Sequence, residues 1–376
     1  MALNIKQLLN ESMPHDLTFS EREKQQVRET VFAKTPATFI RILPLAAVLL
    51  VSLVGYLLYS SYSDSQPAEV TWHEEIIIPN TFETSLNRSV FVPANKEVIY
   101  SKEDGLYSFS PEIDQVEKLV STQTPMAQYS FAVNENWLVW EDFVNEAYTL
   151  NVLNRQTGVT NVIVSFNPLG RLLLEGNQIF YFNSSEEKML YETMNLNSGN
   201  IKTIHEQKDA QADSLREAIG DGKAVVVEKL EKLTTFYIYD TLSGDLVQKS
   251  QGTYPSIHNM YINNERVYMD FATDEGRLEL AYLDIQTGTI STIETPEYSF
   301  STVHGNHVAL SVTEEWGAET DDVELFTLEG NTVKPLTTFP DVKDRLVTPQ
   351  FFEDGILRMV EENYSDGGPT LHLVKP

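Results

Sequence analysis

Residues 224–244 read AVVVEKLEKLTTFYIYDTLSG, and this stretch contains the unit that decides the fold. Its two apolar runs, 224–227 and 236–239, are rich in β-branched and aromatic residues and predict two β-strands. The second run leads into DTLSG, residues 240–244, whose glycine can take the positive φ that a hairpin turn requires. The stretch therefore predicts the middle of an antiparallel sheet with a tight turn at its end.

The same turn pattern, a polar residue followed by Ser/Thr-Gly, recurs along the chain. Its glycines lie 41, 45, 44 and 42 residues apart, at Gly158, Gly199, Gly244, Gly288 and, in a shorter form, Gly330. One apolar strand precedes each turn, and another precedes that strand. A period of ~40–45 residues with four strands in each unit is typical of β-propeller blades.

Seven such units can be counted. The first contains 97–100 and 105–109, five follow around Trp137, Phe180, Val226, Tyr268 and Ala309, and the last contains 355–360 and 370–374. The last unit lacks an outer strand, whereas 69–79, EVTWHEEIIIP, is a strand without a unit. We expect this segment to pair with the last blade, since closing the ring removes exposed edges. The predicted fold is all-β, a seven-bladed β-propeller at residues 69–376; a pair of β-sandwiches is the competing fold, and the even spacing favours the propeller.

The turns and four-strand units resemble the seven-bladed propellers of the WD40-like and TolB-like kind, over residues 69–376. This resemblance implies a fold and transfers no functional residue, because its motifs are shared by proteins of many functions.

Upstream of the repeats, residues 42–62 read ILPLAAVLLVSLVGYLLYSSY, without a charged residue. As a helix this stretch spans ~31 Å, enough to cross a hydrocarbon core of ~30 Å. A buried core helix is the alternative, but globular helices of this length normally show a polar stripe. We therefore predict a transmembrane helix within residues 39–62.

The charges on either side predict the orientation of this helix. Lys34 and Arg41 precede it, whereas Asp64, Glu69 and Glu74 follow it. The positive-inside rule then places residues 1–38 in the cytoplasm and residues 63–376 outside, with 63–68 as a linker. No small-x-small cleavage pattern follows the apolar run, so we predict an uncleaved signal anchor in a single-pass cell-membrane protein.

Composition agrees with an exported domain. The chain has no cysteine, which excludes disulfides and favours a bacterial source. Six of the 27 Lys and Arg residues and five of the 55 Asp and Glu residues lie up to Arg41, so the remainder holds 21 basic and 50 acidic residues. This charge would repel nucleic acid and attract cations, basic peptides or cationic polymers, and its simplest role is solubility.

The predicted cytoplasmic segment contains a capping box formed by Ser20 and Glu23, which predicts a helix over residues 21–32. Val27, Val31 and Phe32 lie on one side of this helix and form a candidate docking surface for a cytoplasmic protein; a tail without a partner is the alternative. The layout of helical segment, membrane span and exported domain resembles bacterial transmembrane regulators of the anti-sigma-factor kind. The segment has no cysteine, so it does not match their zinc-binding class.

Sequence motifs for catalysis are missing. The chain has no P-loop, no dinucleotide-binding glycine pattern and no G-x-S-x-G motif of the hydrolase domain found in membrane-bound prolyl peptidases, which also join an anchor to a propeller. His304 and His307 form the closest histidine pair, in a predicted hairpin turn. The acidic residues, Asp270 among them, do not follow EF-hand spacing and are expected on a solvated rim. We expect no enzyme activity, no cofactor and no metal site.

Two long insertions between strands, at 317–322 and 363–369, could form a binding rim, although insertions are also simply tolerated there. The rim candidates are Trp316, Asp321, Asp322, Tyr364 and Asp366. The expected function is that of an extracytoplasmic binding or sensor propeller that relays or tethers to a cytoplasmic partner and binds an envelope component. The alternatives are an envelope scaffold or assembly protein and, third, a hydrolase or lyase that uses rim carboxylates.

Overall fold

The computed structural model describes residues 72–78, 89–123, 131–165, 170–184, 188–207, 213–254, 256–273, 275–312, 322–339, 348–352, 354–361 and 370–376. The predicted segments 1–38, 39–62 and 63–68 lie outside these residues. Within the described residues, no helix has both the length and the apolar character needed to cross a membrane.

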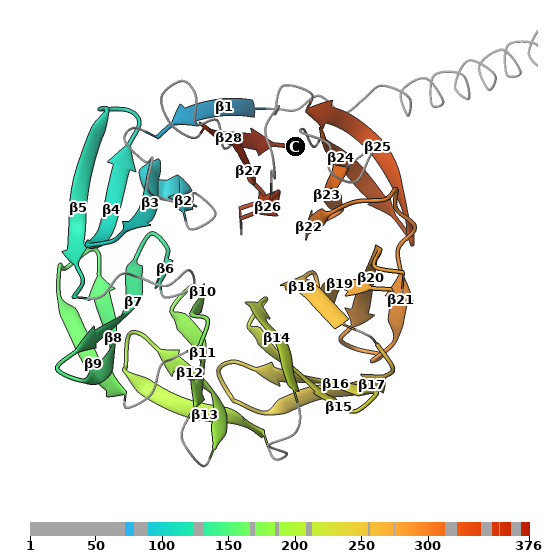
Figure 1. The fold of residues 1–376 in the computed structure, drawn as a ribbon, viewed down its shortest axis with the longest axis horizontal. Helices are drawn as coiled ribbons and strands as arrows, with labels where there is room; N and C mark the ends of the chain where they lie inside the picture. Colours follow the sequence, from blue (N-terminus) through green and yellow to red (C-terminus); the bar gives the residue numbers. More distant parts are fainter. Residues whose placement is uncertain are drawn as a thin grey trace, which may run out of the picture. The chain divides into compact units, whose positions relative to one another are not determined.

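The described strands form seven antiparallel sheets of four strands, arranged as blades around a central opening (Figure 1). The predicted all-β, seven-bladed propeller is therefore confirmed. In each blade the first-named strand below lies nearest the opening and the last lies at the rim.

Blade 1 contains β2 (Val90–Val92), β3 (Glu97–Lys102), β4 (Gly105–Ser110) and β5 (Gln115–Ser121), with the short 3-10 helix η2 (Pro93–Asn95) after β2. Blade 2 contains β6 (Phe131–Val133), β7 (Trp137–Val144), β8 (Ala147–Asn154) and β9 (Thr160–Ser165). Blade 3 contains β10 (Leu173–Glu175), β11 (Gln178–Ser184), β12 (Met189–Asn195) and β13 (Asn200–Gln207). Blade 4 contains β14 (Asp213–Gly220), β15 (Lys223–Leu230), β16 (Leu233–Asp240) and β17 (Leu246–Gly252).

Blade 5 contains β18 (Ser256–Asn263), β19 (Arg266–Ala272), β20 (Leu278–Asp284) and β21 (Ile290–Thr292). Blade 6 contains β22 (Phe300–His304), β23 (His307–Val312), β24 (Asp322–Glu329) and β25 (Thr332–Phe339). Blade 7 contains β26 (Gln350–Phe351), β27 (Leu357–Glu361), β28 (Thr370–Lys375) and, as its outer strand, β1 (Trp72–Ile77).

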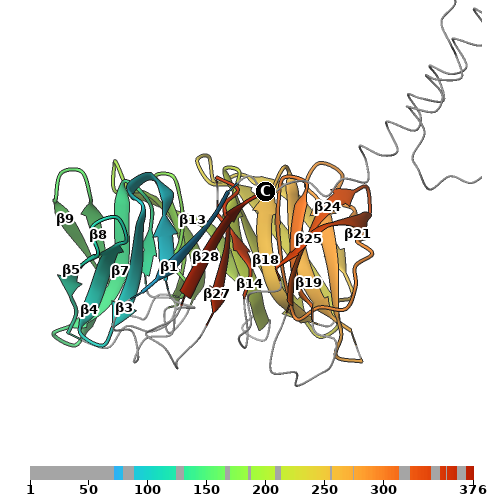
Figure 2. The ribbon, with the colours of Figure 1, turned by 90° about the horizontal axis from the view of Figure 1, so that it is seen from above.

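Blade 7 joins strands from both ends of the propeller. Strand β1 pairs antiparallel with β28, from Trp72 opposite Lys375 to Ile77 opposite Thr370, and the two lie side by side in Figure 2. Among the described residues, β1 is the strand that pairs with the outer edge of β28. Ring closure therefore depends on a strand that lies almost 300 residues from its partner.

The core consists of apolar clusters between neighbouring blades, one at each of the seven boundaries in the described residues. Strand β15 shows how the sequence produces them. Ala224 and Val226 pack against blade 3, whereas Val225 and Val227 pack against blade 5. Because side chains alternate along a strand and both faces are buried, such a strand reads as a continuous apolar run.

The recurring Ser/Thr-Gly turns connect the third and fourth strands of their blades. In blade 4, Oδ1 of Asp240 accepts hydrogen bonds from the backbone N–H groups of Leu242 and Ser243, at 3.1 and 2.8 Å. These donors lower the pKa of the Asp240 carboxyl, the Ser243 N–H most strongly. Gly244 closes the turn at a φ of +70°, which residues with a Cβ rarely adopt.

Candidate functional site

A cavity of about 910 Å³ opens beside the centre of the ring. We call it the channel pocket. Its walls come from the inner strands β10, β14, β18, β22 and β26, with residues also from β19, β20 and β27. Ligand sites are usually concave and largely pre-formed, and this cavity is shared by several blades, so it is the candidate functional site.

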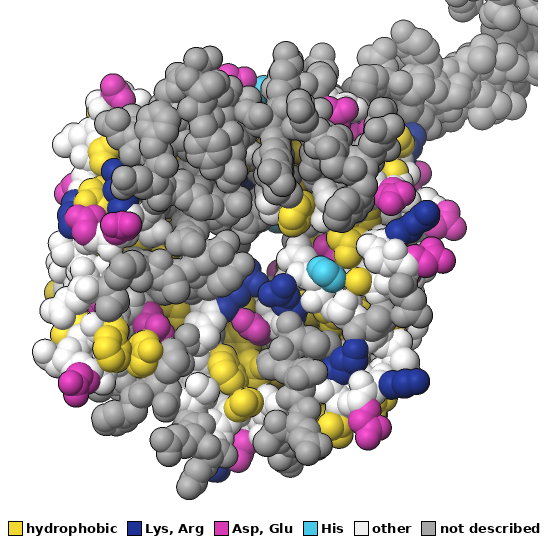
Figure 3. Space-filling view, in the orientation of Figure 1, with side chains coloured by type: hydrophobic (Ala, Val, Ile, Leu, Met, Phe, Trp, Pro, Cys, Tyr) yellow, Lys and Arg dark blue, Asp and Glu magenta, His cyan; other side chains and the backbone are white. Residues whose placement is uncertain are grey.

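Arginine is concentrated in the channel pocket. Three of the eight arginines that follow Trp72 line it, namely Arg171, Arg216 and Arg358, and its described lining includes no lysine. Lys and Arg side chains border the central opening in the space-filling view of Figure 3. The lining also includes three acids, Glu175, Asp221 and Asp270, so in a chain with a net charge of −28 the pocket is formally neutral.

Arg171 and Arg216 come from neighbouring blades and act on the same carboxyl group. Burial raises the pKa of Glu217, and both guanidinium groups oppose that shift. Arg216, on β14, is exposed to solvent. Its guanidinium group has no hydrogen bond or ion pair to another described residue, so it is available to a ligand.

Arg358 lies deeper. Its side chain is buried on β27 and donates a hydrogen bond from one terminal nitrogen to the backbone oxygen of Ser89, which precedes blade 1. Burial lowers the pKa of its guanidinium group to about 10. Nε of Arg358 has no hydrogen-bond partner among the described residues. An uncompensated buried donor of this kind is costly, and an acceptor on a ligand would satisfy it.

Asp270 on β19 adds a buried acid to the pocket wall. Its Oδ1 accepts hydrogen bonds from the hydroxyl groups of Tyr298, at 2.8 Å, and Ser301, at 2.6 Å. The Ser301 hydroxyl also lies 3.0 Å from that of Tyr261. Burial raises the pKa of Asp270 to about 6, against the opposing effect of the two donors.

The position of Asp270 corrects the prediction that it lies on a solvated rim. Its exposed fraction is 1%, and it belongs to the second strand of blade 5. A single acid in an apolar run gives no local signal of whether it faces solvent or a neighbouring blade. Only the packing of blade 6 against blade 5 brings the hydroxyl groups of Tyr298 and Ser301 next to its carboxylate.

His304 lies at the edge of the channel pocket, at the end of β22. Its Nδ1 is 3.2 Å from the amide nitrogen of Asn263 on blade 5, and its ring packs against Phe351 on blade 7. Burial lowers the pKa of both His304 and His307. The two histidines pair across a hairpin turn with Gly305 at a φ of +61°, as the sequence predicted.

The residues singled out from the sequence do not form this pocket. Asp322, the first residue of β24, is exposed and does not line it. The other rim candidates, Trp316, Asp321, Tyr364 and Asp366, lie outside the described residues, as do Val27, Val31 and Phe32. Aromatic residues pack between the blades, since Trp137, Trp140, Phe180, Tyr181 and Tyr268 are all buried there. The signal in the sequence is the presence of three arginines on or beside inner strands of a chain that has few basic residues.

Comparison with known proteins supports the fold. No known protein family and no curated protein matches the chain. Among solved structures, a chain of the mitotic checkpoint complex matches with 10% identity and a TM-score of 0.55, over 83% of this chain and 92% of that chain. TolB from Acinetobacter baumannii matches with 14% identity and a TM-score of 0.41, over 74% and 78%. At 10% identity, the match to the chain of the mitotic checkpoint complex shows a likeness of fold alone.

One expectation from the sequence, that the chain is not an enzyme, is wrong as stated. The fold also matches an acylaminoacyl peptidase from Pyrococcus horikoshii, with 14% identity and a TM-score of 0.49, over 64% of this chain and 44% of that chain. That protein is named as an enzyme. The enzymatic status of the chain is not established.

Proposed function

We propose that this protein is a membrane-anchored propeller that faces the exterior and binds a carboxylate-bearing ligand in the channel pocket. The observation that carries the proposal is the set of three arginines, from blades 3, 4 and 7 and the loops beside them, around one cavity. Guanidinium groups bind carboxylates through charge-assisted, often bidentate hydrogen bonds.

The roles of the three arginines differ. Arg216 is the exposed contact that meets the ligand first, and Arg171 lies near the same carboxyl group, Glu217. Arg358 is held by the Ser89 carbonyl and offers its buried Nε. Two of the three acids in the pocket already accept protein donors: Glu175 accepts the Gly222 N–H at 3.1 Å, and Asp270 accepts two hydroxyl groups. Arg216 and Nε of Arg358 therefore offer donors to a ligand.

The anchoring part of the proposal rests on the sequence. The apolar stretch 42–62 and the charges beside it support a single span with residues 63–376 outside. Val27, Val31 and Phe32 would then connect ligand binding to a cytoplasmic protein. An envelope scaffold without a cytoplasmic partner is the alternative.

The ligand part is tested by fluorescence anisotropy with full-length protein, using labelled hexaglutamate and hexalysine peptides at physiological ionic strength. At that ionic strength the screening length is about 8 Å, so the overall negative charge acts weakly on a peptide in the pocket. We expect hexaglutamate to bind and hexalysine not to bind through this site. Loss of one charge-assisted hydrogen bond is worth ~1.5–3 kcal/mol, so Arg216→Ala should weaken hexaglutamate binding about tenfold or more.

The matched control is Arg277→Ala. Arg277 is exposed but does not line the channel pocket, so its replacement should leave hexaglutamate affinity unchanged. If both variants bind as the unmodified protein does, or if hexaglutamate does not bind, the pocket is not a carboxylate site.

A further inference from the structure

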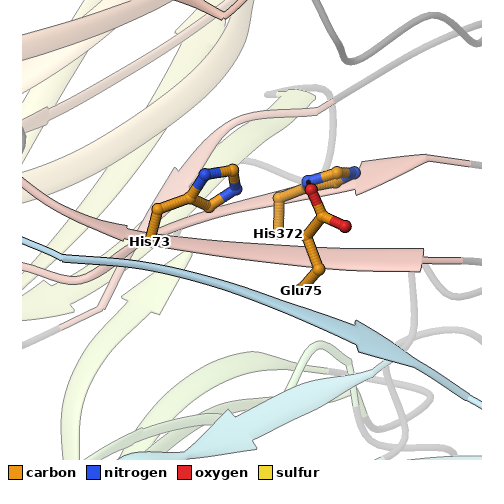
Figure 4. A group of neighbouring side chains, drawn as sticks. All are labelled: His73, Glu75 and His372. Atoms are coloured by element: carbon orange, nitrogen blue, oxygen red, sulfur yellow. Dashed lines mark ion pairs between the residues drawn. The ribbon is translucent and has the colours of Figure 1, made fainter.

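A group of three metal-ligand side chains lies on blade 7, away from the channel pocket. It consists of His73 and Glu75 on β1 and His372 on β28, and Figure 4 shows the three side chains together on one side of the paired strands. We propose that this group is a binding site for a divalent transition-metal ion, with zinc as the ion that fits it best, and that the ion fastens the closure of the ring.

The strand pairing explains why the three side chains meet. Residues two apart on a strand point to the same face, so His73 and Glu75 share one face of β1. Glu75 is directly opposite His372 in the antiparallel register, which puts His372 on that face as well. The next residues on this face, Val374 and Met359, pack toward blade 6, so the group lies on the side of blade 7 that faces blade 6.

The distances are close to those of a metal site. One ligand atom of each side chain lies within 4.8 Å of the others, and Nδ1 of His372 is 3.8 Å from Oε1 of Glu75. Bonds of ~2.0–2.2 Å in a tetrahedral zinc site place ligand atoms about 3.3 Å apart. Closing the remaining difference requires a small rotation of His73 and Glu75, whose side chains are exposed and free to turn.

The ligand types favour zinc over the common hard cations. Two imidazole nitrogens and one carboxylate form a donor set that zinc binds, with water in a fourth position, whereas magnesium and calcium prefer oxygen donors throughout. The buried His372, at 3% exposure, supplies a rigid ligand, and the exposed Glu75 and His73 leave the ion a way in. The net charge of −28 also raises the local concentration of cations.

The location gives the ion a structural effect. Two ligands come from the first strand of the propeller and one from the last, so all three are together only while β1 is paired with β28. An ion that binds only this closed form stabilises it by mass action. Zinc binding should therefore oppose the detachment of β1 and raise the unfolding temperature of the propeller.

The test uses full-length protein without a polyhistidine tag, so that no added histidine binds the ion. Thermal unfolding is followed with and without Zn²⁺, with Mg²⁺ as the ion control, and binding is measured by calorimetry. We expect one Zn²⁺ per chain and a rise in Tm of a few degrees, the scale of shift that modest stabilisation produces in domains larger than 150 residues. Mg²⁺ should give no such rise.

Variants separate this site from other sites on the acidic surface. His73→Gln and Glu75→Gln change exposed side chains, should fold normally, and should each abolish the Zn²⁺-dependent rise in Tm. The matched controls are Glu74→Gln, which changes the adjacent carboxylate on the opposite face of β1, and His307→Gln on blade 6; both should keep the full rise. The proposal is overturned if Zn²⁺ leaves the Tm unchanged, if Mg²⁺ has the same effect, or if His73→Gln and Glu75→Gln respond like the unmodified protein.

Discussion

At the scale of single residues, Asp270 should make the stability of the propeller depend on pH. Burial raises its folded-state pKa to about 6, from an ordinary value of 3.8. The folded state therefore binds the proton more tightly than the unfolded state, so this stabilising contribution is complete below about pH 4 and is lost as pH rises through about 6. A shift of this size corresponds to about 3 kcal/mol.

Replacing Asp270 by Asn should remove this dependence while keeping an oxygen acceptor for Tyr298 and Ser301. We expect the free energy of unfolding of the unmodified protein, relative to Asp270→Asn, to fall by about 3 kcal/mol between pH 4 and pH 7, measured by chemical denaturation. The control is Asp284→Asn. Hydrogen bonds from Thr287 lower the pKa of Asp284 below its ordinary value of 3.8, so its contribution is lost only at lower pH and its relative stability should stay nearly constant between pH 4 and pH 7. If the difference in free energy of unfolding between the unmodified protein and Asp270→Asn does not change with pH in this range, the raised pKa of Asp270 is contradicted.

At the scale of a structural element, strand β1 should stabilise the whole ring through one of its faces. Ile76 is 3% exposed and packs in the cluster between blades 7 and 1, whereas Ile77 beside it is 61% exposed. Ile76→Ala removes buried methyl groups and should lower the free energy of unfolding by about 2–5 kcal/mol. Ile77→Ala should change it by less than about 0.5 kcal/mol.

Both changes are measured by chemical denaturation, and hydrogen exchange in β2 to β5 reports whether blade 1 is loosened as well. The two substitutions remove the same atoms from adjacent positions of one strand, so β propensity and chain length are matched. Equal effects from both would show that β1 does not pack against blade 1 in solution.

At the scale of the whole molecule, the proposed relay predicts two separable sets of partners. Affinity purification from membranes, with mass spectrometry of the bound proteins, compares the intact protein with a version that lacks residues 1–36. We expect a cytoplasmic protein with the intact form only, and the same envelope proteins with both forms, because the propeller and residues 1–38 would lie on opposite sides of the membrane. Replacing Val27, Val31 and Phe32 by Ala should abolish binding of the cytoplasmic partner and leave binding of the envelope proteins unchanged. Recovery of identical envelope proteins and no cytoplasmic protein would favour the scaffold.

Most of the fold could be predicted because its signals are local and repeated. Blades 2 to 5 each carry a turn in which an Asp or Asn oxygen accepts one or more backbone N–H groups and a glycine takes a positive φ, as in Asp240 and Gly244. Such turns are encoded within five residues, and their period indicates a propeller before any long-range contact is considered. Strands buried on both faces, such as β15, add an equally local signal.

The sites could not be predicted in the same way. Arg171, Arg216 and Arg358 are separated by 45 and 142 positions, and they share one pocket only because the blades bend into a ring. His73 and His372 meet only through the register of β1 on β28. The sequence by itself determined the blade unit, its number of repeats and its turn chemistry, since these depend on neighbouring residues. Only the tertiary structure decided which side chains face the channel and which meet at the closure, since that depends on the curvature of the ring and on pairing between its two ends.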